Sequence, residues 1–168
     1  STPPVWVEDK YDGIRAQLHR EGDELRLFSR DLNDITGGFP EIVEAARAAA
    51  WEGILDGEIL AWKDGAVLPF LQLQTRIGRK KPPAEVLAAV PVIYVAFDAL
   101  ALGEGGPPEP LLRDPLRERR RRLEALDLPA TPGFGLAALA DAADAAELER
   151  VFAEAQARGN EGLMLKDP

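Results

Sequence analysis

Two runs of alternating apolar and polar residues near the beginning of the chain constrain its fold most. Residues 14–20 and 24–29 alternate in this way, and Glu21-Gly22-Asp23 between them is a turn signal. Since a period of two is typical of strands with one buried face, this stretch predicts a β-hairpin. We expect His19, the only histidine in the chain, to be a structural residue of that hairpin.

The other predicted elements are strands in antiparallel groups with helices between them. Strands are expected at 5–9, 54–62 (interrupted at Asp56-Gly57-Glu58), 67–68, 92–98 and 162–166, and helices at 40–50, 69–77, 83–89, 114–126 and 141–158. Asp114 is the expected cap of the fourth helix, and loops are expected at 32–38, 102–110 and 128–135. Residues 92–98 are the most apolar run and should form a central, buried strand. The predicted class is α+β, with two antiparallel sheets and flanking helices, and not a doubly wound parallel sheet.

Length and composition exclude several classes of protein. A chain of 168 residues can bury one proper core. The lack of cysteine excludes disulfides, thiolate metal sites and a cysteine nucleophile. No apolar run reaches the roughly 20 residues that span a bilayer, so we expect no membrane span. The chain begins at Ser1 and its only methionine is Met164, so we expect an excised piece of a longer protein.

The net charge of −9 argues against a uniformly basic nucleic-acid binder. Basic residues nevertheless cluster in two places. Arg76, Arg79, Lys80 and Lys81 are the better candidates for contacts with a DNA backbone. The second cluster, residues 113–122, has Glu118 and Glu124 at helical spacing, which predicts a solvated, salt-bridged helix face.

Lys10 is the candidate nucleophile, within Glu8-Asp9-Lys10-Tyr11-Asp12-Gly13-Ile14-Arg15. A lysine at the end of a strand can direct its amine into a cleft, and Gly13 permits a tight turn beside it. Asp12 and Arg15 add one charge of each sign. These residues predict a covalent lysine nucleophile; the alternative is a solvated turn with surface charges.

Four further motifs follow in order: Phe28-Ser29-Arg30, Leu55-Asp56-Gly57-Glu58-Ile59, Val95-Ala96-Phe97-Asp98 and Glu161-Gly162-Leu163-Met164-Leu165-Lys166. Together with Lys10-x-Asp-Gly-x-Arg, they resemble the motifs of covalent nucleotidyltransferases, specifically ATP-dependent DNA ligases. The resemblance implies the ATP-grasp-like nucleotidyltransferase core of these ligases. The Ala/Arg-rich composition is typical of a bacterial protein.

The resemblance implies that Lys10 attacks the α-phosphate of ATP and becomes lysyl-AMP, so we expect a depressed Lys10 pKa. It assigns the other roles by position. Glu8 accepts a hydrogen bond from the adenine amino group, Phe97 stacks on the base, and Glu58 accepts a hydrogen bond from the ribose. Arg15 and Arg30 bind ribose or phosphate oxygens, Lys166 binds phosphate, and Glu161 helps hold Mg²⁺ or Mn²⁺. Phe97 as a core residue and Glu58 as a surface residue are the structural alternatives.

The resemblance also implies what surrounds this chain. We expect residues 1–168 to be an adenylation domain that lacks the last lysine motif, an OB-fold domain acting in cis and any N-terminal DNA-binding domain. Such a piece should bind ATP weakly, self-adenylate slowly and not seal nicks alone. Nicked duplex DNA is the expected partner of the full-length enzyme, in replication, repair or recombination. We expect a monomer in the cytoplasm, associated with the nucleoid.

Three other functions remain open. An RNA ligase or an mRNA capping guanylyltransferase would share the lysine chemistry but use another acceptor. A non-catalytic nucleotide- or DNA-binding module would use the same residues without a covalent step.

Overall fold

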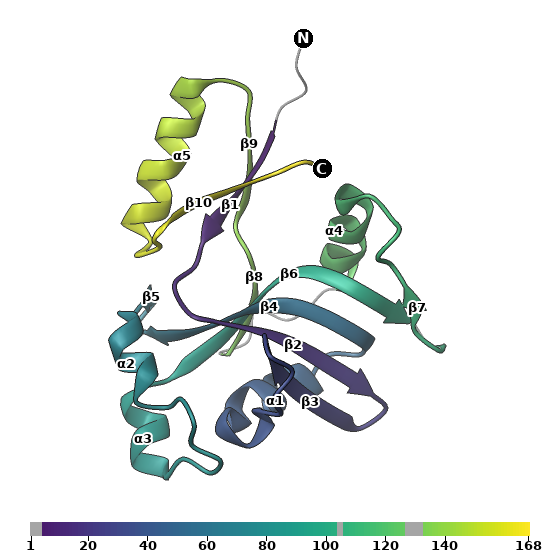
Figure 1. Ribbon diagram of the computed structural model, residues 1–168, viewed down its shortest axis with the longest axis vertical. Coiled ribbons are helices and arrows are strands. Elements are labelled where there is room, and N and C mark those ends of the chain that lie inside the picture. Colours follow the sequence, from purple (N-terminus) through teal and green to yellow (C-terminus); the bar gives the residue numbers. More distant parts are fainter. Residues whose placement is uncertain (1–4, 104–105, 127–132) are drawn as a thin grey trace.

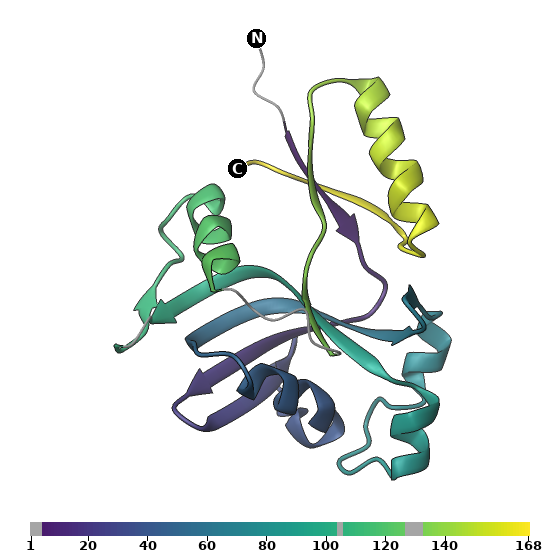
Figure 2. The ribbon, with the colours of Figure 1, turned by 180° about the vertical axis from the view of Figure 1, so that it is seen from behind.

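Two sheets form the framework of the computed structural model, which describes residues 5–103, 106–126 and 133–168 (Figures 1 and 2). The large sheet has the order β3-β2-β4-β6-β7, with β5 added to β4 and β8 added to β6. Its strands are β2 (Ile14–Glu21), β3 (Glu24–Ser29), β4 (Glu52–Lys63), β5 (Ala66–Val67), β6 (Val92–Gly103), β7 (Glu109–Pro110) and β8 (Phe134–Leu136). The small sheet has the order β10-β1-β9, formed by β1 (Val5–Lys10), β9 (Leu139–Ala142) and β10 (Gly162–Lys166).

The fold class predicted from the sequence is confirmed. The strand pairs are antiparallel, with the exception of the parallel pair β6–β8. The predicted hairpin is the β2–β3 pair, whose register places Glu21 opposite Glu24. Strand β6 lies inside the large sheet, as expected for the most apolar run.

Helices flank this framework. They are the short 3₁₀ helix η1 (Thr36–Gly38), α1 (Pro40–Arg47), α2 (Phe70–Gln74), α3 (Ala84–Ala89), α4 (Leu116–Ala125) and α5 (Ala145–Ala157). The large sheet lies between the small sheet and α1, and α5 runs alongside the small sheet (Figures 1 and 2). Within the described residues, the model contains no helix with the length and apolar character needed to span a bilayer.

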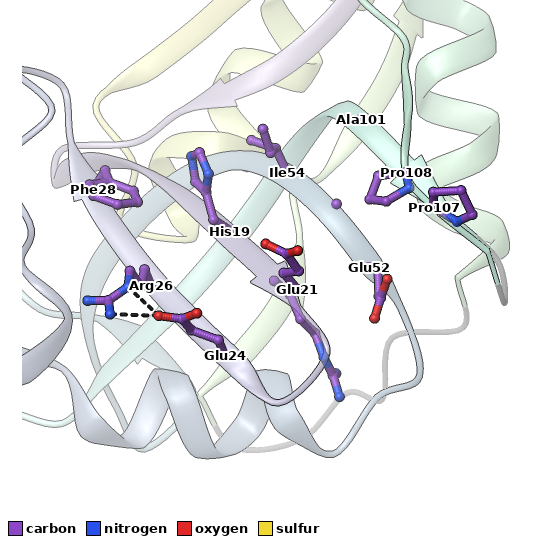
Figure 3. Close-up of a pocket in the computed structure, with 12 residues that line it drawn as sticks. His19, Glu21, Glu24, Arg26, Phe28, Glu52, Ile54, Ala101, Pro107 and Pro108 are labelled. Carbon is purple, nitrogen blue, oxygen red and sulfur yellow. Dashed lines mark hydrogen bonds and ion pairs between the residues drawn. The ribbon is translucent and has the colours of Figure 1, made fainter.

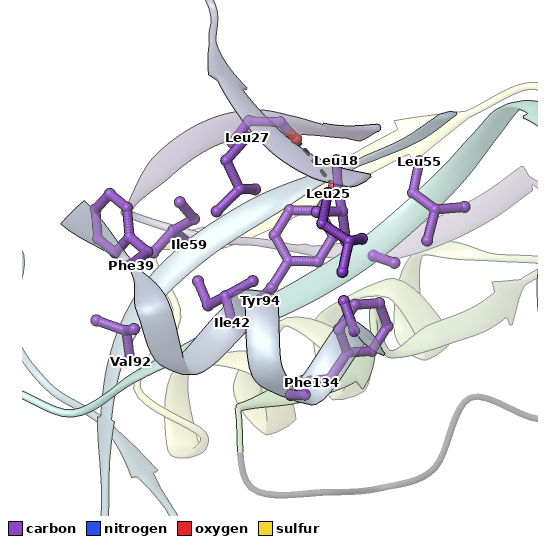
Figure 4. Close-up of a cluster of buried hydrophobic side chains, with 14 of the residues drawn as sticks. Leu18, Leu25, Leu27, Phe39, Ile42, Leu55, Ile59, Val92, Tyr94 and Phe134 are labelled. Carbon is purple, nitrogen blue, oxygen red and sulfur yellow. Dashed lines mark hydrogen bonds between the residues drawn. The ribbon is translucent and has the colours of Figure 1, made fainter. Parts of the chain in front are cut away.

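The main core lies between the large sheet and α1 (Figure 4). Leu18 and Leu55 project from the sheet, where they are fully buried, and Ile42 projects from α1. Tyr94 is buried among them and its hydroxyl donates to the carbonyl oxygen of Ala16 at 3.0 Å. Since alternate residues of a strand face opposite sides, Arg15, Gln17 and His19 of β2 face away from this core. Arg20 lies on the core side, where its guanidinium packs on the Trp51 ring.

Two helix starts predicted from the sequence are wrong. Asp141 belongs to strand β9, and Asp144 instead caps α5, its carboxylate accepting from the Glu147 N–H at 2.9 Å. Sheet pairing overrides the helix propensity of the alanines here, because Ala142 pairs with Val5 and is buried. Asp114 does not cap α4: Pro115 occupies the N-cap in an extended conformation.

Other helix and strand boundaries also differ from the predicted ones. Strand β4 is continuous where an interruption was predicted, and a register shift between Asp56 and Gly57 takes up the irregularity. Helices α1 and α2 are shorter than predicted, β6 runs five residues further than the predicted Asp98, to Gly103, and the predicted loops at 32–38 and 102–110 contain η1 and β7. Part of the loop predicted at 128–135, residues 128–132, lies outside the described residues.

Arg76 is a core residue and not a surface DNA contact. Its side chain is fully buried, and it forms an ion pair with Glu41. The guanidinium also donates to the carbonyl oxygens of Val90 and Gly38, at 2.9 and 2.8 Å, and lies 5.1 Å from the centre of the Phe39 ring. Arg76 therefore joins α1, η1 and the end of α3, and the prediction of a DNA contact is corrected for this residue.

We expect Arg76→Met to lower the free energy of unfolding by about 3 to 5 kcal/mol, because it leaves Glu41 and two buried carbonyl groups without their partner. The matched control is Arg79→Met, an exposed arginine of the same cluster, which should change stability by less than about 0.5 kcal/mol. Urea denaturation followed by circular dichroism measures both. Equal effects of the two substitutions would contradict the structural role.

Candidate active site

A cavity of about 560 Å³ opens between the two sheets, a volume suited to a small ligand. Its walls come from both sheets, from α4 and from the loops between them. The lining residues are Glu8, Asp9, Lys10, Tyr11, Arg15, Arg30, Asp56, Glu58, Phe97, Asp98, Leu116, Arg119, Met164 and Lys166. The residues to which the resemblance assigns a role at the nucleotide are therefore brought together here, with the exception of Glu161, which lies beside Lys10.

Lys10 and Glu161 are neighbours because β1 pairs with β10. The register places Lys10 opposite Gly162, and the Glu161 N–H donates to the Lys10 carbonyl oxygen at 3.0 Å. The Lys10 ammonium lies 3.7 Å from a Glu161 carboxylate oxygen, and both side chains are about half exposed, at 49% and 54%. The candidate nucleophile thus reaches the cavity while remaining open to a partner from solvent.

A buried charge cluster that the sequence did not reveal holds the strand carrying Lys10. The Asp9 carboxylate accepts two hydrogen bonds from Arg158, at 2.7 and 2.6 Å, and one from the Asn160 side chain at 2.6 Å. Asp9 is among the lining residues of the cavity, but its carboxylate is turned toward Arg158 and Asn160, and these contacts tie the end of α5 to β1. The separation in sequence, about 150 residues, gave no signal for this cluster.

Glu8 and Phe97 face one another from different sheets, with Lys166 between them. Glu8 is buried and accepts a hydrogen bond from the Lys166 ammonium at 2.8 Å, and that ammonium lies 4.7 Å from the centre of the Phe97 ring. Burial raises the pKa of Glu8, although Lys166 and Arg120 oppose the rise. A phosphate contact for Lys166 stays a prediction, since its ammonium here contacts a carboxylate.

The third group of predicted residues lies on β2 and β4. Arg15 donates to both Asp56 oxygens, at 2.7 and 3.3 Å, and its guanidinium is 5.8 Å from the Phe97 ring centre. Glu58 is partly buried, which raises its pKa to about 7, although a hydrogen bond from the Gly13 N–H opposes the rise. Glu58 is therefore not a plain surface glutamate. Arg30 is exposed at the rim of the cavity.

Helix α4 contributes charged side chains to the cavity and its surroundings, although the sequence predicted that these residues form a solvated helix face. Arg119 donates to both oxygens of Asp98, at 2.9 and 3.1 Å, and Arg120 is buried. The predicted salt-bridged, solvated face is found on the outer side of α4, where Arg121 and Glu118 form an exposed ion pair. A signal for Arg120 exists in the sequence, since it shares one helical stripe with Leu116 and Leu123.

The carboxylates present suit a divalent cation that arrives with its substrate. No group of three or more histidine, cysteine, aspartate or glutamate side chains in the described part of the chain can hold a metal by itself. Magnesium commonly takes one or two protein carboxylates together with substrate phosphates. Glu161, half exposed beside Lys10, provides one such carboxylate.

A second cavity, of about 650 Å³, lies at the far end of β2, β3 and β4 (Figure 3). Glu24 and Arg26 form an ion pair at its wall, and His19 packs edge-on against Phe28 with ring centres 4.8 Å apart. Burial lowers the pKa of His19, in keeping with the structural role predicted for it. Of the motif residues only Phe28 lines this cavity, and none of the residues assigned to nucleotide binding does.

Comparison with known proteins identifies relatives over nearly the whole chain. The family described as "ATP dependent DNA ligase domain" matches residues 1–168. A probable DNA ligase of Koribacter versatilis is 46% identical over 96% of this chain and 31% of its own length. A DNA ligase of Haloarcula marismortui is 43% identical over 96% of this chain and 28% of its own length. The chain thus spans about a third or less of these curated relatives.

Solved structures lead to the same family. The ligase domain of M. tuberculosis LigD superimposes with a TM-score of 0.69 at 28% identity, covering 96% of this chain and 48% of that one. Mycobacterial DNA ligase D, whose structure was determined in complex with ATP and MES, gives a TM-score of 0.69 at 27% identity, over 96% and 48% of the two chains. The chain belongs to the ATP-dependent DNA ligase domain family, of which it forms an adenylation domain.

Proposed function

We propose that the cavity binds ATP and that the Lys10 amine attacks its α-phosphorus. The observation that carries this proposal is the meeting, in one cavity, of Lys10 from the small sheet with Phe97 and Glu58 from the large sheet. An aromatic ring, carboxylates and a lysine amine are the groups that a base, a ribose and a phosphate require. The structure of the mycobacterial relative with ATP supports the choice of nucleotide.

The reaction is a substitution at phosphorus. A bond forms between the Lys10 nitrogen and the α-phosphorus, the bond to the bridging oxygen of pyrophosphate breaks, and the nitrogen loses a proton. Only the neutral amine attacks, and a free lysine is neutral in about one molecule in two thousand at pH 7. Mg²⁺ or Mn²⁺ carried by the phosphates, with Glu161 as a carboxylate ligand, would neutralise phosphate charge.

The remaining residues would bind the nucleotide. Phe97 would stack on the base and Glu8 would accept from its amino group, since both line the cavity and Glu8 is buried. Glu58 would accept from a ribose hydroxyl. Arg15 and Arg30 would donate to ribose or phosphate oxygens. Lys166 would exchange the Glu8 carboxylate for a phosphate oxygen when the base enters.

The acceptor we propose is the 5′-phosphate of a nick in duplex DNA, in keeping with the names of the curated relatives. The adjoining 3′-hydroxyl would then displace AMP. Because the chain spans 31% of the Koribacter relative, we assign nick sealing to a longer protein with an OB-fold domain, and slow self-adenylation to this chain. RNA ligation and GTP-dependent capping are the competing functions within the same chemistry.

Incubation with ATP and Mg²⁺ should add the mass of one AMP to the chain, and peptide mapping should place it on Lys10. Lys10→Ala should abolish the adduct while leaving ATP affinity within about threefold, because the amine forms the bond but provides little of the binding. Lys63→Ala, at an exposed lysine away from the cavity, is the matched control and should label normally. An adduct on another residue, or labelling by GTP in preference to ATP, would contradict the proposal.

The affinity for adenosine should rise as the pH increases from 6 to 8, because Glu58, with a pKa of about 7, then becomes an ionised acceptor for the ribose hydroxyl. Adenosine is chosen because it has no phosphate group that titrates in this range. Glu58→Gln should bind more weakly at pH 8 and lose the pH dependence. Calorimetric titrations across this range measure both; a wild-type affinity independent of pH would count against the ribose contact.

The acceptor is tested with the full-length protein, after it has been adenylated and freed of ATP. Transfer of AMP to the 5′-phosphate of nicked duplex DNA should exceed transfer to nicked RNA by at least roughly tenfold, about 1.4 kcal/mol in the barrier. Gel analysis of radiolabelled AMP measures both acceptors side by side. Preferential transfer to RNA would favour the RNA ligase function instead.

A further inference from the structure

Arg120 of α4 is a buried cation whose position none of the proposed roles explains. Its side chain is 7% exposed, and the Nη1 atom is buried without a hydrogen-bond partner. The same atom lies 3.9 Å from a Glu8 carboxylate oxygen, beyond hydrogen-bond reach. A buried donor that faces a buried carboxylate without bonding to it is costly, and this cost calls for an explanation.

The other two nitrogens of Arg120 fix its guanidinium. Nε donates to Glu124 at 2.8 Å, within α4, and Nη2 donates to the Ala137 carbonyl oxygen at 2.8 Å. Ala137 lies between β8 of the large sheet and β9 of the small sheet. Arg120 is therefore anchored to the crossing between the sheets, and its third nitrogen, Nη1, is held toward Glu8 of the small sheet.

Glu8 has two cationic neighbours, Lys166 and Arg120, and only Lys166 has a proposed second role, as a phosphate ligand. Lys166 bonds one oxygen of Glu8 at 2.8 Å, while Arg120 faces the other oxygen. The nearby acidic group, Asp98, is engaged by Arg119. If Lys166 moves to a phosphate when nucleotide binds, Arg120 is the cation that stays beside the buried Glu8 carboxylate.

We propose that Arg120 is a positioning residue of the nucleotide site, which holds the Glu8 carboxylate as an acceptor toward the base and so sets the preference for a purine with a 6-amino group. This inference rests on the proposed function, in which Glu8 reads that amino group. Arg120 touches neither base nor phosphate in this scheme: it acts through Glu8.

The test compares AMP with purine riboside 5′-monophosphate, which lacks the 6-amino group, by calorimetric titration of the 168-residue chain. Neither ligand can form the covalent adduct. The wild-type chain should bind AMP at least roughly tenfold more tightly, since hydrogen bonds to charged groups are the stronger ones. Arg120→Met should reduce this ratio to about twofold or less.

The control is Arg121→Met, the same substitution at a 68% exposed position of the same helix, which should keep the wild-type ratio. A merely structural Arg120 would weaken both ligands equally, so a wild-type ratio in Arg120→Met overturns the proposal, whatever the absolute affinities. Thermal unfolding of each variant is recorded in parallel. If Arg120→Met does not fold, Arg120→Lys replaces it, because lysine keeps the charge but loses the planar guanidinium. A ratio reduced severalfold in Arg120→Lys supports the positioning role. An unchanged ratio overturns it.

Glu8→Gln separates this inference from the proposed function. If Glu8→Gln lowers the ratio and Arg120→Met does not, Arg120 has no positioning role but Glu8 still reads the base. If the wild-type chain shows no preference for AMP and Glu8→Gln changes nothing, the base contact itself fails and the role of Arg120 is overturned with it.

Discussion

The antiparallel ladder between β1 and β10 is the constraint on which the site depends. Its register places Lys10 opposite Gly162 and Glu8 opposite Met164. Because successive residues of a strand face opposite sides, Glu8 and Lys10 both face the cavity, whereas Asp9 between them faces α5. A slip of one residue would turn the Asp9 carboxylate to the face that now carries Glu8 and Lys10 and remove both functional groups from it. The bonds from Arg158 and Asn160 to Asp9 oppose such a slip.

The two sheets must also be held apart at a fixed distance, since each contributes half of the cavity. The chain crosses between them after β1 and again between β8 and β9. Gly13 allows the first crossing to pass close to the backbone of β4, where a Cβ atom would collide with the Ile59 carbonyl oxygen. The Tyr11 hydroxyl accepts from the Ala138 N–H at 3.1 Å and so joins the two crossings. Burial raises the pKa of Tyr11 to about 12, which keeps it neutral at physiological pH.

Acidic groups in the cavity are kept at a cost in stability. Burial raises the pKa of Glu8 and of Glu58, which means that their ionised forms are disfavoured in the folded chain. For Glu58 the unfolded carboxyl ionises near pH 4.5 and the folded one near 7, so its contribution to stability decreases as the pH rises through this window. Nearby arginines and Lys166 offset part of the cost. Such carboxylates are typical of a site selected for binding and not for stability.

The sequence by itself determined the hairpin, the α+β class and the set of residues that gather around Lys10, because strand periodicity and short motifs are local signals. It did not determine where α5 begins, because pairing of Ala142 with Val5 outweighs a local preference for helix. Nor did it distinguish Arg76 from a surface arginine, since its burial depends on segments far apart in the chain. Only the tertiary structure decided which charges are paired, and with which partners, because a salt bridge or a shared cavity is a relation between elements that no local pattern encodes.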